Sequence, residues 1–230
     1  MAATGGDMDF WELVKADKIQ EVSHMLKHTH RLNIDILGRI FHDSPLMVAI
    51  KNGNIEMMQL LIDNGADCNL KCSDPLYLGH TPLFFATKTL HACGLHMMKI
   101  LIDNGASTTV VGARGHTLLH LLFSDHHRDP SDADNRLWLL LDNIPRMDIG
   151  RLITQKDWNG NTASDLNRKA NAVSIADILD IEVQRRRDCW ISKRRVLTDQ
   201  LRPECHAPMS ILKDDVLQYI IDLCDHEFDT

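Results

Sequence analysis

One stretch of eight residues occurs twice in this chain, first at 60–67 and again at 100–107. The first copy reads Leu-Leu-Ile-Asp-Asn-Gly-Ala-Asp and the second reads Ile-Leu-Ile-Asp-Asn-Gly-Ala-Ser. A shorter motif keeps step with it, as Ser44-Pro45-Leu46, Thr81-Pro82-Leu83 and, in weaker form, Thr117-Leu118-Leu119. A repeat length between roughly 20 and 50 residues indicates stacked structural units, each of which buries its apolar face against its neighbours.

Each unit carries the local signals of two short helices. Ser44 can accept a hydrogen bond from an unpaired backbone N–H, and Pro45 suits the first helical position, where its missing N–H has no partner. Apolar residues recur at helical spacing on both sides of the Asn52-Gly53-Asn54 turn. Gly65 then fits the left-handed residue that commonly follows a helix end. The unit is therefore predicted to be a helix, a turn and a second helix.

This alternation of Ser/Thr-Pro-Leu, short helix, glycine turn, second helix and Asn-Gly-Ala-Asp resembles the ankyrin repeat over about residues 9–183. The resemblance implies an all-α ankyrin-repeat solenoid of about five helix pairs with projecting β-turn fingers, followed by a C-terminal helical tail. The expected domains are an N-terminal capping repeat at 1–35, ankyrin repeats at 36–70, 71–110 and 111–154, a C-terminal ankyrin repeat at 155–184, a basic linker helix at 185–203 and a helical tail at 204–230.

The third and fourth units depart from the regular pattern. Residues 72–77 lengthen the finger of the third unit. The polar stretch 124–135 is rich in helix-breaking residues, so an exposed loop is expected there. Trp138 interrupts a run of leucines and is expected in the core. His80 and His120 lie in or beside the Thr-Pro-Leu motif, where structural hydrogen bonds are their expected role.

Charge and composition restrict the partners. A net charge of −7 argues against general affinity for nucleic acid. The N-terminus shows no basic segment followed by an apolar run, and no apolar stretch reaches the roughly 20 residues that span a bilayer, so no membrane partner is expected. The six cysteines are scattered, which argues against a disulfide framework. A reducing compartment, the cytoplasm or the nucleus, is therefore expected. The basic run 185–195 has two interpretations, a localisation or nucleic-acid patch and the solvated face of a linking helix, and the second is preferred.

Motifs for catalysis or metal binding are missing from the sequence. It contains no glycine-rich phosphate loop, paired-carboxylate site or nucleophile motif. Its histidines and cysteines lack the paired two-residue spacings of a structural zinc site. We therefore expect no enzymatic activity, no cofactor and no metal.

The projecting turns are the predicted binding surface, because stacked repeats face one another and leave these turns free. Large side chains at the turns have no structural need, although Phe41 and Leu78 could pack between adjacent fingers. Arg, Tyr and Trp are also the residue types that dominate binding hot spots. The predicted target-binding residues are Arg39, Phe41, His42, Tyr77, Leu78, Arg114, His116 and Trp158.

Residues 210–223 are predicted to form a short amphipathic helix with Val216, Leu217, Ile220 and Leu223 on its apolar face. Its sequence resembles the first helix of the F-box, except that Lys213 stands where that pattern has proline. An ankyrin array with such a truncated F-box is similar to poxviral-type ankyrin proteins of the PRANC kind. That resemblance implies that the Skp1 adaptor of a cullin ubiquitin ligase binds Leu212, Val216, Leu217, Ile220 and Ile221.

Two functions from different classes stay open. In the first, the chain is a protein–protein interaction adaptor, which holds a target on its ankyrin face and recruits Skp1 through the tail. A SOCS-box tail that recruits elongin ranks lower, because the expected Leu-Cys-Arg element is missing. In the second, the chain is a stoichiometric inhibitor or scaffold that resembles the inhibitors of NF-κB-type transcription factors, and the tail only caps the stack.

Overall fold

A computed structural model describes residues 5–29, 32–38, 42–89, 92–112, 114–122, 130–170, 175–186 and 188. Every regular element in these ranges is a helix, which confirms the all-α prediction. The elements are α1 (Gly5–Lys15), α2 (Ile19–His28), α3 (Pro45–Lys51), α4 (Ile55–Asp63), α5 (Pro82–Lys88), α6 (Gly94–Asp103), the 3-10 helix η1 (Leu118–Leu121), α7 (Pro130–Asn143), α8 (Arg146–Thr154) and α9 (Ala163–Lys169). Residues 175–186 are also helical.

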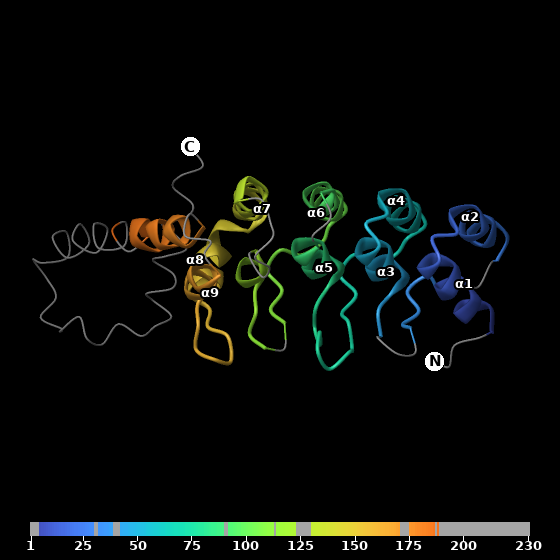
Figure 1. Ribbon diagram of the computed structural model, residues 1–230, viewed down its shortest axis with the longest axis horizontal. Coiled ribbons are helices and arrows are strands. Elements are labelled where there is room, and N and C mark those ends of the chain that lie inside the picture. Colours follow the sequence, from blue (N-terminus) through green and yellow to red (C-terminus); the bar gives the residue numbers. More distant parts are fainter. Residues whose placement is uncertain are drawn as a thin grey trace, which may run out of the picture.

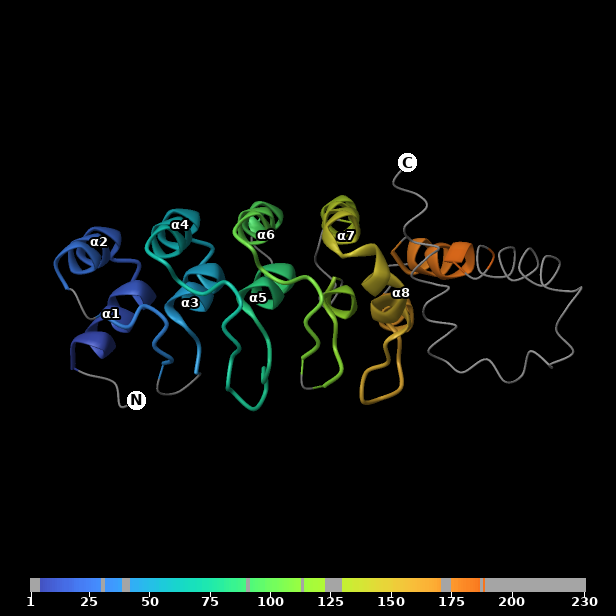
Figure 2. The same ribbon diagram turned by 180° about the vertical axis from the view of Figure 1, so that it is seen from behind.

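The helices stand in two parallel rows (Figure 1). The inner row consists of α1, α3, α5, η1 and α9, and the outer row consists of α2, α4, α6 and α7. The loops that precede α3, α5, η1 and α9 all extend from the inner row to the same side, and Figure 2 shows this arrangement from behind. We call these loops the first to fourth fingers, and they comprise residues 38–43, 72–80, 112–116 and 157–161.

Each finger is closed by a backbone hydrogen bond across its base. The N–H of Cys72 donates to the carbonyl of His80 at 2.8 Å, and the N–H of Gly112 donates to the carbonyl of His116 at 2.9 Å. The first and fourth fingers are closed in the same way at 2.9 Å, by Gly38 to Asp43 and by Asp157 to Asn161. The four fingers therefore share the same closed base next to the inner row of helices.

The inner helices begin where the sequence predicts. Ser44 Oγ accepts a hydrogen bond from the N–H of Met47 at 3.3 Å, and Pro45 is the first helical residue of α3. At α9, Thr162 Oγ1 accepts from the N–H of Asp165, whose carboxylate accepts from the N–H of Thr162. This reciprocal pair satisfies two backbone donors that the first turn leaves unpaired.

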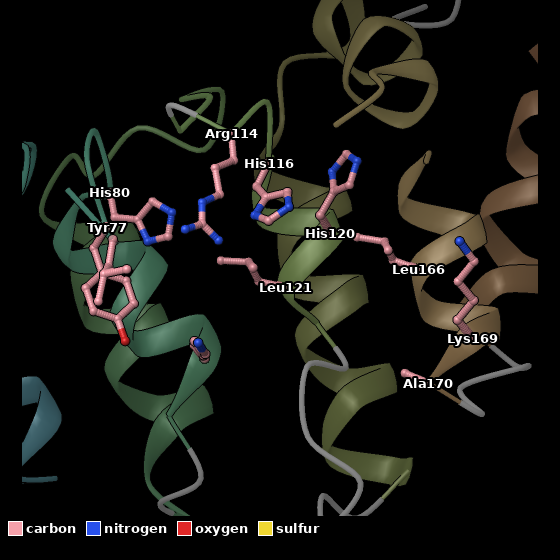
Figure 3. A pocket seen from close by; sticks show the side chains of 11 residues that line it. Tyr77, His80, Arg114, His116, His120, Leu121, Leu166, Lys169 and Ala170 are labelled. Atoms are coloured by element: carbon pink, nitrogen blue, oxygen red, sulfur yellow. The ribbon is translucent and has the colours of Figure 1, made fainter. Parts of the chain in front are cut away.

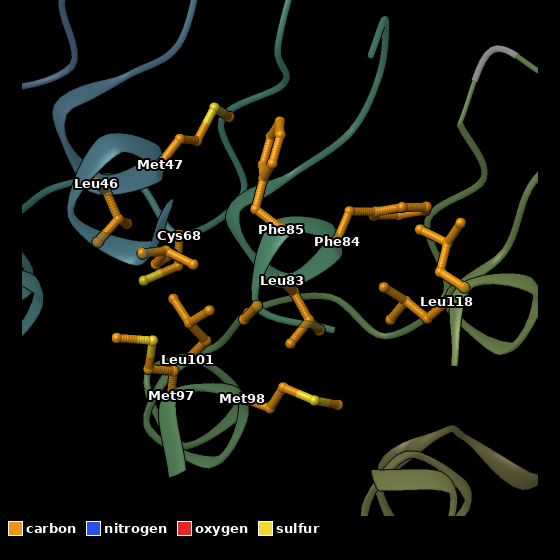
Figure 4. Packing of buried hydrophobic residues seen from close by; sticks show 14 of the residues in the cluster. Leu46, Met47, Cys68, Leu83, Phe84, Phe85, Met97, Met98, Leu101 and Leu118 are labelled. Carbon is orange, nitrogen blue, oxygen red and sulfur yellow. The ribbon is translucent and has the colours of Figure 1, made fainter. Parts of the chain in front are cut away.

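Apolar side chains between the rows and between adjacent repeats form one continuous core. Leu46, Leu83 and Leu119, the equivalent leucines of the repeated motif, are fully buried in successive units. Figure 4 shows Phe84 reaching from α5 toward Leu118 of the next unit. Methionine pairs at 57–58 on α4 and 97–98 on α6 are also fully buried, and their flexible side chains fill space in this core. Aromatic side chains are few because this thin core is filled mainly by aliphatic residues.

The fourth unit differs from the sequence prediction. Residues 130–135 form the beginning of α7, whereas a loop was expected throughout 124–135. Pro130 is compatible with a helix because it occupies the first position, where it removes no hydrogen bond. Trp138 was expected in the core but is 52% exposed. The buried positions of α7 include Leu137 and Leu140 at helical spacing, and Trp138 lies on the opposite face.

A buried arginine joins α7 to the end of α5. The side chain of Arg136 is 1% exposed, and its Nη1 donates to the carbonyls of Ala86, Thr87 and Thr89 at 3.1–3.2 Å. Its Nε lies 2.9 Å from Asp132 Oδ2, one helical turn earlier. The carbonyls at the C-terminus of α5 have no partner within the helix, so Arg136 supplies both donors and positive charge there.

The chain continues beyond α9 into the helix at 175–186, which lies beside the end of the stack (Figure 1). Of the predicted linker at 185–203, the structure describes only residues 185, 186 and 188, and the predicted tail at 204–230 lies outside the described residues. Within the described ranges, no helix combines the length and the apolar character needed to cross a membrane.

Candidate functional site

The last residue of each finger occupies an equivalent position, directly before the Ser or Thr that precedes an inner helix. These four residues are Asp43, His80, His116 and Asn161. The residue before each one has a positive φ, of 50° at His42 and 75–80° at Gly79, Gly115 and Gly160. Glycine adopts this left-handed conformation without steric cost, which explains its place in three of the four fingers.

A cavity of about 400 Å³ lies between the second and third fingers and the inner helices (Figure 3). Tyr77, His80 and Lys88 line it from the second finger and α5. The third finger and η1 contribute Arg114, His116, His120 and Leu121, and α9 contributes Leu166 and Lys169. Figure 3 shows the guanidinium of Arg114 reaching between the rings of His80 and His116. We call this cavity the finger pocket.

His80 is held in an apolar and cationic setting. Its ring stacks on Phe84 with a centroid distance of 4.6 Å, and the residue is 8% exposed. A Cβ at Gly112 would lie 2.9 Å from Cδ2 of His80, so glycine allows the third finger to approach the ring. Burial lowers the pKa of His80 to about 4, and the nearby charges of His116, Lys88 and Arg114 act in the same direction. The ring is therefore neutral near pH 7.

The other two histidines are fixed by hydrogen-bonding groups. His120 Nδ1 accepts from the N–H of Thr117 at 3.1 Å, which leaves the proton on Nε2 to donate to the Asn161 carbonyl at 3.3 Å. His120 thus has the structural role that its position in the motif predicted. His116 Nε2 lies 3.7 Å from the carboxylate of Asp157. Burial still lowers the pKa of His116, because it outweighs the attraction of Asp157.

A lysine stands eight residues after the finger-end position in three of the four units, as Lys51, Lys88 and Lys169. Lys51 Nζ pairs with the Asp43 carboxylate at 2.6 Å, and Lys169 Nζ donates to the side-chain oxygen of Asn161. Lys88 follows His80, which offers no negative charge. Among the described residues, Lys88 has no ion pair or hydrogen bond, and its Nζ lies 5.6 Å from the centre of the Tyr77 ring.

The structure brings together some predicted target-binding residues and separates others. Tyr77, Arg114 and His116 line the finger pocket. Leu78 and Trp158 lie on the second and fourth fingers and are 47% and 78% exposed. His42 is partly buried at the first finger. Arg39 and Phe41, and the predicted adaptor-binding residues Leu212, Val216, Leu217, Ile220 and Ile221, lie outside the described residues.

Sequence reasoning missed Lys88, Lys169 and the inner-helix residues of the pocket. A signal was present, because the lysines keep a constant distance from the finger-end position. That spacing could have been found by aligning the units on their Ser or Thr caps.

Comparison with known families supports the repeat interpretation. A family model described as "Ankyrin repeats (3 copies)" matches residues 12–111 and, in a second overlapping match, residues 46–129. Together the two matches span just over half of the 230 residues. A search of curated proteins gave no match to the chain.

Proposed function

Because the chain belongs to the ankyrin-repeat family, we propose that it is a non-catalytic protein-binding module that holds a target protein on its fingers and inner helices. Ankyrin repeats are interaction modules, and stacking leaves their projecting turns free for a partner. The target is not specified by the family.

The observation that carries this proposal is the exposure of large apolar side chains on the fingers. Leu76 is 63% exposed, Leu78 is 47% exposed and Trp158 is 78% exposed. Leu76 also lines the finger pocket, so the apolar tips continue into a concave, partly polar surface. Exposed apolar groups next to a polar concavity are typical of a protein-binding surface, where buried Trp and Arg often dominate the affinity.

Three histidines in one pocket could act as acids or bases in catalysis. The geometry of His80 and His120 favours a binding role instead. Both ring nitrogens of His120 face protein partners, so neither is free to carry a proton to or from a substrate. The ring of His80 stacks on Phe84, and its pKa of about 4 makes it a weak base. In the described part of the chain, the pocket contains no serine, threonine, cysteine or carboxylate to act with these rings as a nucleophile.

Affinity capture from cells with matched surface variants tests the proposal. The double variant Leu76→Ser/Leu78→Ser and the single variant Trp158→Ser each remove exposed apolar surface from a finger. Trp138→Ser is the matched control, because Trp138 is 52% exposed on α7 in the outer row. We expect both finger variants to lose partners that the wild type and the control retain. Equal capture by all four proteins would contradict the proposal.

The adaptor role of the tail rests on its sequence alone, as a predicted amphipathic segment that resembles the first F-box helix. We propose it as an extension of target binding, and recovery of Skp1 with the intact chain but not with Leu217→Asp is the expected result. The inhibitor or scaffold alternative predicts instead that removing residues 204–230 leaves both target binding and target turnover unchanged. Failure to recover Skp1 with the intact chain removes the adaptor role without affecting target binding.

A further inference from the structure

We propose that the finger pocket is an acceptor for carboxylate side chains, and that the target protein therefore presents an acidic segment to the second and third fingers. This inference rests on the proposed function, because it identifies the chemistry of the partner at the same surface. It is drawn from a comparison between equivalent positions in the repeats.

The first step is that the third unit lacks the acidic residue that pairs with the equivalent lysine in the second unit. In the second unit, the Asp43 carboxylate neutralises Lys51 at 2.6 Å, and the side chain of Asp43 is 5% exposed. In the third unit, the equivalent lysine is Lys88 and the equivalent of Asp43 is His80. A neutral imidazole cannot balance an ammonium group, so Lys88 keeps an unneutralised charge beside the cavity.

The second step is that another cation, Arg114, lines the same pocket. Arg114 reaches between His80 and His116, and within the described residues its side chain has no hydrogen bond or ion pair. Arg114 and Lys88 both act on His80 and His116, since each lowers the pKa of both rings. Because burial keeps the His80 ring uncharged near neutral pH, Lys88 and Arg114 are the cations at this site, and both would attract a bound anion.

The third step is that no acid within the described residues is available to fill this role. The lining of the finger pocket contains no Asp or Glu in that part of the chain. The carboxylate of Asp157 lies 3.7 Å from His116 Nε2, and it already accepts hydrogen bonds from the N–H groups of Asn159 and Asn161, both at 2.8 Å. The carbonyls of Ala86 and Thr87 at the end of α5 accept hydrogen bonds from Arg136. The anion must come from outside the described stack.

The fourth step selects a protein carboxylate over a nucleic acid. The chain carries a net charge of −7, so a long polyanion would meet repulsion outside the finger pocket. A short acidic segment that places one carboxylate in the finger pocket would meet less of that repulsion than a long polyanion. Tyr77, Leu121 and Leu166 supply apolar walls for the methylene groups of a glutamate, and Arg114 offers a planar set of donors that fits a carboxylate.

The test uses two short fluorescent peptides with the full-length protein at neutral pH. One peptide alternates Glu and Ser, and the other alternates Gln and Ser as an uncharged match. Binding is followed by fluorescence anisotropy, and its location by amide chemical shifts in nitrogen-15 spectra. We expect the Glu peptide to bind and to shift amides of residues 76–88 and 114–121, and the Gln peptide to bind at least about tenfold more weakly.

Three variants test whether the Glu peptide binds at the finger pocket. Lys88→Gln/Arg114→Gln removes both unpaired charges and should weaken the Glu peptide by about tenfold. His80→Asp copies the Asp43–Lys51 arrangement into the third unit, so it should weaken the peptide while the fold is kept. Lys99→Gln removes one positive charge at an exposed position of α6, away from the pocket, and should leave the affinity unchanged. Unshifted amide spectra away from the substituted positions confirm that each variant is folded.

Equal affinity for the Glu and Gln peptides would overturn the inference, as would full binding by His80→Asp. Displacement of the Glu peptide by inorganic phosphate well beyond that by acetate at equal ionic strength would assign the site to a phosphate group and also overturn it. In any of these cases, capture of a target that depends on Leu76, Leu78 and Trp158 would leave the proposed function standing. The two claims therefore fail separately.

Discussion

The second and third repeats place the same lysine at the same position and surround it differently. In the second repeat, Lys51 forms an ion pair with Asp43, and this pair connects the end of the first finger to α3. In the third repeat, Lys88 faces His80 and shares its cavity with Arg114. One repeat thus uses the lysine for its own stability, whereas the other leaves the charge available. On the proposal made above, equivalent positions of this repeat protein serve folding in one unit and recognition in the next.

The largest expected effect concerns Arg136, which binds the carbonyls at the end of α5, next to Lys88. Arg136→Met should lower the free energy of unfolding by about 3 kcal/mol, because the buried carbonyls of Ala86 and Thr87 lose their donor. Urea denaturation followed by circular dichroism measures this change. If the variant were as stable as the wild type, Lys88 could replace Arg136 at the end of α5, and the contrast between the two repeats would weaken.

The next effect is a pH dependence that belongs to the third repeat. The folded-state pKa of His80, about 4, lies below the ordinary value of 6.5, so the unfolded chain binds more protons between these values. Stability should therefore be full above pH 6.5 and fall as the pH drops toward 4, by about 3 kcal/mol for His80 alone. His80→Phe should reduce this loss, as measured by urea denaturation at pH 7.5 and 4.5. The same loss in both proteins would contradict the assigned environment of His80.

A smaller effect is expected in the second repeat. Asp43→Asn keeps the shape of the side chain and removes its charge, so Lys51 loses its partner. We expect a loss of about 1–2 kcal/mol, since Asp43 is buried while Lys51 is 37% exposed and partly hydrated. Thermal and urea unfolding measure the change. A neutral outcome would mean that the aromatic rings of Tyr77 and Phe85 suffice to hold Lys51.

The smallest effect on stability is expected for the equivalent lysine of the third repeat. Lys88→Met should change the free energy of unfolding by less than about 0.5 kcal/mol, because no described residue depends on its charge. It should also raise the pKa of His80, since a neighbouring positive charge is removed. Histidine titration by NMR reads this pKa directly. A stability loss as large as that of Asp43→Asn would make the two lysines equivalent.

Much of the fold follows from local signals in the sequence. The caps at Ser44 and Thr162 and the glycine turns act within a few residues, so their effect can be predicted without tertiary contacts. The fourth unit shows where such reasoning stops. Arg136 binds carbonyls about 50 residues earlier, and no local pattern distinguishes it from an exposed helix arginine. The run of leucines around Trp138 predicts a buried side chain. The helical spacing of Leu137 and Leu140 instead determines which face of α7 is buried, and Trp138 lies on the other face.

The candidate site was predictable only in part. Finger position alone indicated Tyr77, Arg114 and His116, because projecting turns are free of stacking contacts. The pocket also depends on side chains from three different units, and Lys169 lies more than 80 residues from Lys88 in the chain. Such convergence is a property of how the repeats stack. The sequence did hold the lysine spacing, which becomes meaningful only when the units are aligned.

Hydrogen–deuterium exchange of the chain, free and bound to its captured target, tests the central claim that the finger side is the binding surface. The account predicts slowed exchange at residues 72–80, 114–121 and 157–161, with the outer helices α4 and α6 unchanged. Slowed exchange confined to the outer helices, with the fingers unaffected, would contradict it.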